Sequence, residues 1–175
     1  MSTHDMASPL PGVVLRFAAR QDTALVLAFV RELAAYEKLA HEVMTDEATL
    51  ADALFGAHPG AEVVIAQVDG HAAGFALFFH NFSTFLGRRG LYLEDLYVRP
   101  QFRGLGLGRV LMAFLARLAI ERGCGRFEWW VLDWNEPALR FYREIGAVPM
   151  DEWTVQRVTG PALEALAAEC VVAEP

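Results

Sequence analysis

Residues 92–109 read YLEDLYVRPQFRGLGLGR, and this stretch decides the fold. Its first part, up to Val98, is a run of aromatic and aliphatic residues that is typical of a β-strand. The part from Arg103 to Gly108 is rich in glycine and opens a helical pattern that continues to about Arg122. A helix N-terminus has unpaired N–H groups and a partial positive charge, and glycines let its backbone approach an anion. The stretch therefore predicts a strand, a phosphate-binding loop and a helix.

The glycine spacing excludes two other phosphate-binding loops. A dinucleotide-binding loop requires G-x-G-x-x-G, and a P-loop ends in G-K-[ST]. Residues 104–108 read GLGLG and match neither pattern. From the spacing alone, a plain glycine-rich turn is an equal alternative. Arg103 and Arg109 at the two ends of the loop favour an anion, because guanidinium groups form charge-assisted hydrogen bonds.

The rest of the chain predicts further strands and helices around this unit. Strands are predicted over residues 13–18, 62–68, 72–79, 91–98, 127–132 and 154–158. Helices are predicted over residues 22–38, 45–55, from the glycine loop to 122, 135–146 and from 161 onward, with Asp22 as a cap. Asp69-Gly70 predicts a two-residue hairpin, and the strand–helix–strand unit predicts one parallel strand pair. The sheet is therefore mixed.

Composition and charge narrow the class of protein. The 175 residues are 54% hydrophobic and 21% charged, which excludes a disordered chain. We expect a flexible leader over residues 1–11 and a single domain over residues 12–172. No apolar run reaches the length of a membrane span. The net charge of −7 disfavours nucleic acid and suits a cationic small molecule. Two cysteines and five scattered histidines predict no metal site, and the cysteine usage predicts a cytoplasmic protein.

The glycine run and its flanks resemble a known family. Arg103, Gly106 and Gly108 fit the motif [QR]-x-x-G-x-[GA], and R-G-L-G-L-G after YLEDLYVRPQF resembles the acyl-CoA pyrophosphate loop of the GNAT (Gcn5-related) N-acetyltransferase superfamily. Residues 32–37 (ELAAYE), 134–138 (WNEPA) and 141–142 (FY) resemble its diamine (spermidine/spermine) acetyltransferase branch. Trp129 and Trp130 are bulkier than the residues that the family usually has in the strand beside the cofactor.

The resemblance implies a fold and an assembly. The expected fold class is α/β (α+β), with a mixed, mostly antiparallel, twisted sheet of about seven strands flanked by helices. The fourth and fifth strands, over residues 91–98 and 127–132, are expected to splay apart and admit acetyl-CoA as the co-substrate. A homodimer is expected, because members of this branch pair through their C-terminal strands and helices. No metal is implied.

The resemblance also implies two catalytic residues. Tyr142 is expected to lie near the CoA sulfur and act as a general acid, and Glu94 to deprotonate the amine through water. From spacing alone, Tyr142 belongs to an apolar helical stripe with Ala138 and Phe141 and has the pattern of a core residue. Neighbouring residues of a regular strand face opposite sides, so Glu94 and Asp95 cannot both face solvent unless the strand is bulged. Two solvated acids on an edge strand are the alternative.

Binding roles follow from the same resemblance. Cofactor binding is expected from the backbone of Leu96, Tyr97 and Val98, from Arg103, Gly104, Leu105, Gly106, Leu107, Gly108 and Arg109, and from Asn135, Pro137 and Tyr142. Asn135 also suits the N-cap of the helix that Pro137 begins. Acceptor binding is expected from Tyr36, Glu37, Glu94, Asp95 and Glu152. For each of these acids, the alternative is that it is a solvated surface group without a binding role.

The function that this pattern favours is acetyl-CoA-dependent N-acetylation of a small primary amine, by direct transfer. A di- or polyamine or a thialysine-like amine is the expected acceptor. An aminoglycoside, an amino acid or a protein N-terminus is the alternative acceptor, and a CoA-binding sensor without turnover is the alternative of a different class. The expected partners include no nucleic acid and no membrane.

Overall fold

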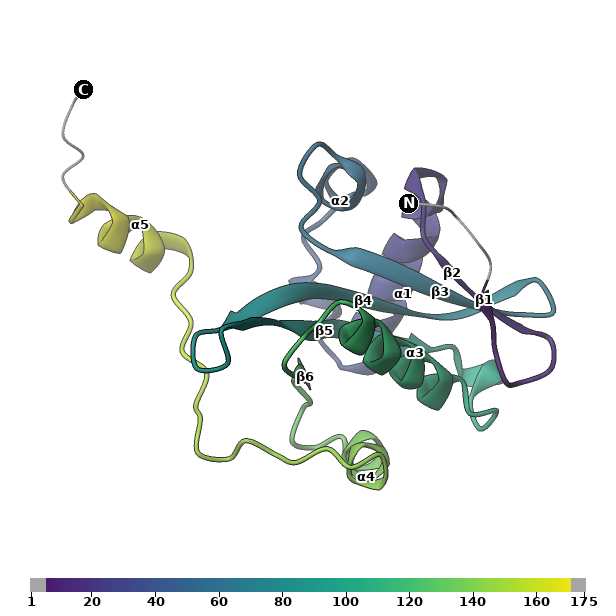
Figure 1. Ribbon diagram of the computed structural model, residues 1–175. Coiled ribbons are helices and arrows are strands. Elements are labelled where there is room, and N and C mark those ends of the chain that lie inside the picture. The colour runs from purple at the N-terminus through teal and green to yellow at the C-terminus, as the bar shows by residue number, and fades with distance from the viewer. Residues whose placement is uncertain (1–5, 171–175) are drawn as a thin grey trace. The chain divides into compact units, whose positions relative to one another are not determined.

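The computed structural model describes residues 6–170 of the chain. It divides into two compact units, of which the first ends at Trp130 and the second begins at Val131, and each is described by itself. The first unit is a six-stranded sheet in the order β1 to β6, with β1 Met6–Ala7, β2 Val13–Phe17, β3 Glu62–Val68, β4 His71–Ser83, β5 Arg88–Val98 and β6 Phe127–Trp129 (Figure 1).

Neighbouring strands of the sheet are antiparallel except for the last pair. β5 and β6 run parallel, from Leu91 opposite Phe127 to Leu93 opposite Trp129. In the sequence, α3 (Leu107–Glu121) follows β5 and precedes β6, and it forms the crossover that a parallel pair requires. The predicted mixed, mostly antiparallel sheet flanked by helices is therefore confirmed.

The number of strands differs from the expected seven. Residues 154–158 form no strand, and every one of these side chains is exposed. A strand forms only where the backbone of a neighbouring strand pairs with it, and no strand within residues 6–170 pairs with residues 154–158. At the N-terminal end, Met6 and Ala7, which belong to the predicted flexible leader, pair with Leu15 and Val14 of β2. The remainder of that leader before Met6 lies outside the described residues.

The Asp69-Gly70 hairpin forms as predicted. Val68 pairs with His71, and the two residues between them have φ angles of 47° and 79°. Positive φ at both positions is the signature of the type I′ turn, whose twist matches that of the flanking strands. The turn fixes the register of β3 against β4 and thereby places β5.

Helices cover both faces of the sheet. α1 is Thr23–Tyr36 and α2 is Glu47–Phe55, and Figure 1 shows α1 and α3 on opposite faces. On the α1 face, Phe29 stacks on Phe75 at 5.1 Å between ring centroids, and both belong to an apolar cluster that includes Leu33 and Tyr97. On the α3 face, Leu107 packs with Val13 and Ala73. This packing holds the end of α1 and the start of α3 against β5.

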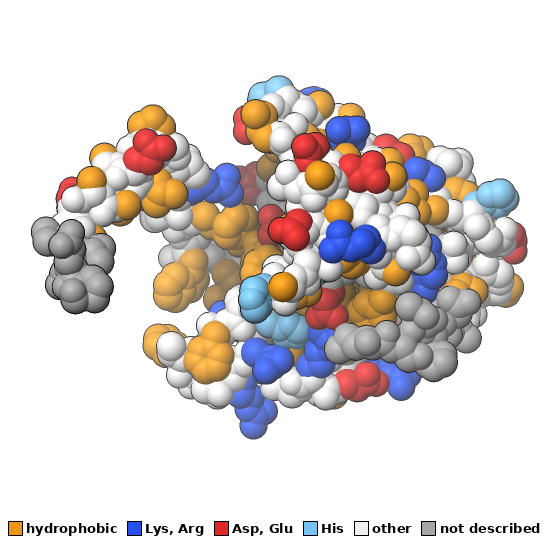
Figure 2. Space-filling view, turned by 90° about the horizontal axis from the view of Figure 1, so that it is seen from above, with side chains coloured by type: hydrophobic (Ala, Val, Ile, Leu, Met, Phe, Trp, Pro, Cys, Tyr) orange, Lys and Arg blue, Asp and Glu red, His pale blue; other side chains and the backbone are white. Residues whose placement is uncertain are grey.

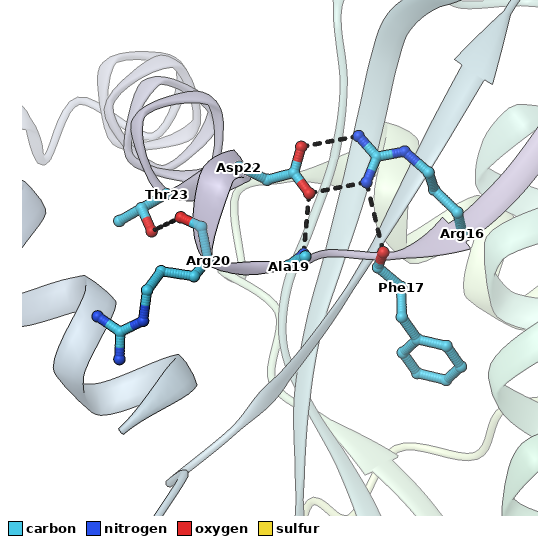
Figure 3. A network of polar contacts seen from close by, with 6 residues as sticks. All are labelled: Arg16, Phe17, Ala19, Arg20, Asp22 and Thr23. Carbon is cyan, nitrogen blue, oxygen red and sulfur yellow. Dashed lines mark hydrogen bonds and ion pairs between the residues drawn. The ribbon is translucent and has the colours of Figure 1, made fainter. Parts of the chain in front are cut away.

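The start of α1 lies where the sequence predicts it. Asp22 is the N-cap residue, but its carboxylate accepts no hydrogen bond from the helix. It accepts instead from both terminal nitrogens of Arg16, at 2.7 and 2.8 Å, and from the Ala19 N–H at 2.8 Å (Figure 3). The Arg16 guanidinium holds the pKa of Asp22 below its usual range. This ion pair fastens the end of β2 to the start of α1.

The second unit consists of two helices and an irregular stretch. α4 is Glu136–Glu144 and α5 is Gly160–Ala168, both near their predicted positions. Across residues 131–170 no side chain is buried. Hydrophobic side chains lie on the exposed surface of α5, at the left of Figure 2. No helix within residues 6–170 is long and apolar enough to cross a membrane.

Candidate active site

A bulge in β5 presents the two adjacent acids. Asp95 pairs with Leu77 and Leu93 pairs with Phe78, which leaves Glu94 without a partner in β4. A bulge of this kind re-aims side chains and commonly occurs beside active sites. Glu94 is exposed and Asp95 is half-buried. The bulge is the condition under which both acids can reach one side of the strand.

A third carboxylate belongs to the same cluster. Glu37 follows the last residue of α1, and its pKa is raised because the group is partly buried. Burial, with a further contribution from the negative charges of Glu94 and Glu37, raises the pKa of Asp95 to about 7. Three acids from the end of α1 and the bulge of β5 therefore share one electrostatic environment. A cation bound among them would relieve their mutual repulsion.

Aromatic rings line the strand next to these acids. Tyr92 lies 5.0 Å from Phe79 and 5.8 Å from Trp130, centroid to centroid. Burial and the nearby charges of Glu94 and Glu128 raise the pKa of the Tyr92 phenol. The Trp130 side chain is 59% exposed. Such a wall suits the methylene groups and the charge of an alkylammonium ion.

Sequence reasoning did not single out Phe79, Tyr92 or Trp130 as site residues. The signal that could have found Tyr92 is its position two residues before Glu94, because alternate residues of a strand share a face. Phe79 could not be found in this way, because only the pairing of β4 with β5 sets it opposite Tyr92. Ring contacts across strands follow from register rather than from local sequence.

The open edge of β5 begins where β6 ends. β6 pairs with β5 only as far as Leu93, whereas β5 continues to Val98. Within residues 6–170, no strand pairs with the β6 side of residues 94–98. The strand predicted over residues 127–132 thus ends at Trp129, and residues 94–98 of β5 lie beyond its reach. A ligand with amide groups can pair with the free side of this segment as an added strand would. Of the three residues predicted there, Tyr97 is buried and Leu96 and Val98 are half-buried.

The glycine loop places backbone N–H groups at the start of α3. Gly104 and Gly106 have φ angles of 78° and 83°, in the left-handed region that favours glycine. Gly106 is the N-cap of α3 and has no side chain to satisfy the first-turn N–H groups. These donors are available to an anion.

Gly108 fits a ligand rather than a packing requirement of the chain. Its φ is not positive, and a Cβ added there meets no atom of the described chain within 4 Å. Neither backbone conformation nor crowding therefore demands glycine at this position. A bound pyrophosphate would fill the space that a side chain would otherwise take. The loop thus leaves space for a phosphate group beside Gly108.

Arg103 precedes the loop and is held by three contacts. Its Nε donates to the carbonyl oxygen of Val98 at 2.9 Å. Its Cζ lies 4.9 Å from the ring centroid of Tyr36 and 5.7 Å from that of Tyr97. Arg109 is exposed at the other end of the loop. A residue of the predicted phosphate loop thus contacts Tyr36, which the resemblance had assigned to the acceptor.

The other predicted residues lie in the second unit. The side chain of Asn135 accepts a hydrogen bond from the Ala138 N–H at 3.4 Å, so its predicted capping of α4 is confirmed. Pro137 lies in the first turn of α4. Tyr142 lies in α4 with its ring 5.4 Å from that of Phe141. Glu152 lies in the irregular stretch and is exposed. Their roles toward ligands stay predictions.

No group of three or more histidine, cysteine or acidic side chains within residues 6–170 is arranged to hold a metal ion. Cys124 and Cys170 are both free thiols.

Comparison with known proteins places this arrangement in a family. Residues 27–147 match the profile described as Acetyltransferase (GNAT) family. A thialysine N-epsilon-acetyltransferase of Sus scrofa is 34% identical over 171 residues, which span 91% of this chain and 100% of that protein. An L-ornithine N5-acetyltransferase of Arabidopsis thaliana is 29% identical over 87% of this chain and 86% of its own length.

The solved structures agree with the sequence relatives. An integron cassette protein from the mobile metagenome of V. cholerae superposes with a TM-score of 0.75 at 30% identity, covering 89% of this chain and 98% of that one. The profile matches well over half of the chain, and the relative from Sus scrofa is matched along its whole length. The chain belongs to the acetyltransferase (GNAT) family.

Proposed function

We propose that the protein transfers the acetyl group of acetyl-CoA to a small primary amine that carries a second positive charge. The observation that carries this proposal is the cluster of Glu37, Glu94 and Asp95 beside the open edge of β5. A carboxylate whose ionisation is opposed by two neighbouring acids belongs to a site that a di- or polyamine, or a thialysine-like amine, would stabilise. Relatives named for thialysine, L-ornithine and spermidine/spermine support the same class of acceptor.

Acetyl-CoA supplies an activated acetyl thioester, and different residues of the chain bind its different parts. The N–H groups of the loop from Gly104 to Gly108 hold the pyrophosphate, with Arg103 and Arg109 adding charge. The backbone of residues 96–98 pairs with the pantetheine arm and donates to the thioester oxygen, whose negative charge grows during the reaction. The resemblance adds Asn135 and Pro137 to this set.

Proton transfer requires a base for the ammonium group and an acid for the departing sulfur. Glu94 and Asp95 take the proton of the ammonium group through water, which exposes the nitrogen lone pair for attack on the thioester carbon. A group that titrates near pH 7, as Asp95 does, is well matched to this task. Tyr142 donates a proton to the departing sulfur and regains one from the acetylated nitrogen, so that the products are the N-acetyl amine and the CoA thiol. The role of Tyr142 rests on the resemblance.

An amino acid with a side-chain amine is one candidate acceptor within this class. The names of two relatives, a thialysine and an L-ornithine acetyltransferase, favour it. These acceptors carry a carboxylate as well as two ammonium groups.

Free-thiol release from acetyl-CoA tests the proposal. The panel contains putrescine, spermidine, spermine, thialysine, lysine, ornithine and an aminoglycoside. We expect turnover with the di- and polyamines or with the amino acids that carry a side-chain amine, and little turnover with the aminoglycoside. Binding of CoA without turnover of any amine would favour a sensor and contradict the proposal. A preference for the aminoglycoside would contradict the acceptor class alone.

We also propose a cytoplasmic homodimer as the working form.

A further inference from the structure

The guanidinium of Arg103 is held at the turn between β5 and α3 before any ligand arrives. Its Nε is committed to the Val98 carbonyl oxygen at 2.9 Å, and its plane lies near two tyrosine rings. Among residues 6–170, this leaves its two amino groups as donors for a phosphate oxygen. An arginine whose side chain is already ordered loses less conformational entropy when it binds an anion.

The two rings differ in what else they do. Tyr97 is only 6% exposed and packs on Phe29 in the core, so its removal would disturb the fold. Tyr36 is 38% exposed at the last turn of α1. Its distance to the Arg103 Cζ, 4.9 Å, is the shorter of the two. Tyr36 is therefore the contact of Arg103 that can be changed without opening the core.

The end of α1 fixes Tyr36 in place. Leu39 donates its N–H to the Ala34 carbonyl at 2.8 Å, and Lys38 donates to the Ala35 carbonyl at 3.2 Å. These two bonds form a Schellman motif, with Lys38 at φ 63° in the position that glycine usually takes. The ring of Tyr36 is thus presented to Arg103 by a helix terminus whose carbonyl groups are satisfied.

We propose that Tyr36 is a positioning residue for the phosphate loop, so that it governs affinity for acetyl-CoA rather than for the amine. The inference rests on the proposed use of acetyl-CoA. It reassigns Tyr36 from the acceptor side, where the resemblance placed it, to the cofactor side, where its contact lies. A cation–π contact at an exposed site corresponds to about a two- to five-fold change in affinity.

The test compares Tyr36→Leu with Tyr36→Phe, which keeps the ring and loses only the hydroxyl. Affinity for CoA is measured directly by calorimetry, and the KM values for acetyl-CoA and for the amine are measured separately. We expect Tyr36→Leu to weaken CoA binding and raise the KM for acetyl-CoA about two- to five-fold. The KM for the amine should stay unchanged, and Tyr36→Phe should match the wild type. The Tm of each variant checks that α1 is intact.

A double-variant cycle isolates the contact. In an Arg103→Leu background, Tyr36→Leu should weaken CoA binding no further, because its partner is already gone. Independent, additive losses would overturn the proposal. So would a raised KM for the amine with unchanged CoA affinity, or a Tyr36→Phe variant as weak as Tyr36→Leu. If no amine is acetylated by the wild type, the proposed acceptor fails, while the calorimetry still decides the role of Tyr36.

Discussion

Asp95 is the residue at which burial and charge act together. It is half-buried, and the carboxylates of Glu94 and Glu37 both lie close enough to oppose its ionisation. A group in this position costs stability when ionised and gains interaction energy when a cation arrives. The same arrangement therefore links folding stability, pH and binding of the acceptor.

Stability should depend on pH through Asp95. The folded-state pKa of about 7 lies above the usual value of 3.8, so the unfolded chain releases this proton first. Below about pH 4 Asp95 is protonated in both the folded and the unfolded chain and does not reduce the free energy of unfolding. The loss of stability grows as the pH rises toward 7 and is complete above pH 7. Asp95→Asn should therefore be more stable than the wild type at pH 8, by up to about 4 kcal/mol, and equal to it near pH 4.

Denaturant unfolding at the two pH values measures this difference. Glu164→Gln, on the exposed surface of α5, is the matched control and should show no such dependence. An Asp95→Asn variant that is less stable than the wild type at pH 8 would show that the carboxylate is stabilised in the folded state.

The general acid can be tested with a one-atom change. Tyr142→Phe keeps the ring contact with Phe141 and removes only the hydroxyl. If the hydroxyl protonates the departing sulfur, turnover should fall by roughly 10²–10⁴. The affinity for CoA should change little. Steady-state kinetics with unchanged turnover would assign Tyr142 to the apolar stripe of α4 alone.

At the scale of elements, the loop before α3 separates stability from binding. Gly106 has a φ of 83° and Gly108 does not have a positive φ. Gly106→Ala should therefore destabilise the protein by about 1 kcal/mol or more. Gly108→Ala should be neutral or slightly stabilising, because it meets no neighbouring atom and alanine favours helix. Its affinity for CoA should nevertheless fall.

Thermal unfolding and CoA calorimetry on both variants check this separation. Unimpaired CoA binding by Gly108→Ala would mean that the ligand does not approach the loop at this position.

Several elements were predictable because their signals are local. Asp69-Gly70 specifies its own turn through two positive φ angles. The glycine loop marks the start of α3 for the same reason. Other features depend on pairing with distant residues. β4 and β5 extend to Ser83 and from Arg88 because they pair with each other, where sequence reasoning expected a loop. The bulge at Glu94 is likewise a property of two strands, which the sequence could only state as a condition.

The candidate site shows the same division. Glu37, Glu94 and Asp95 were each predicted from motifs, and the fold brings them into one electrostatic environment. Their coupling could not be read from the sequence, because α1 and β5 are more than fifty residues apart. The contact between Arg103 and Tyr36 is of the same kind, which is why the motifs assigned the two residues to different ligands.

At the scale of the whole molecule, the second unit carries apolar side chains without burying any. Val148, Met150 and Trp153 in the irregular stretch are all exposed, Trp153 to 72%. Exposed apolar groups of this size commonly mark an interface. The expected homodimer would cover them. Trp153→Glu should therefore shift the protein from dimer toward monomer.

Sedimentation equilibrium over a range of concentrations measures that shift. Glu152→Gln, the neighbouring position, is the control and should leave the assembly state unchanged. A wild-type protein that stays monomeric at high micromolar concentration would contradict the expected homodimer.

We propose that the acidic cluster of Glu37, Glu94 and Asp95 selects an amine with a second positive charge. The most direct measurement is kcat/KM for acetylation of 1,5-diaminopentane and of pentylamine, which differ only in the second ammonium group. The wild type should prefer the diamine by about ten-fold or more, equivalent to about 1.4 kcal/mol, and Glu37→Gln/Asp95→Asn should lose most of that preference while binding CoA normally. Equal kcat/KM values for the two amines in the wild type would contradict the account.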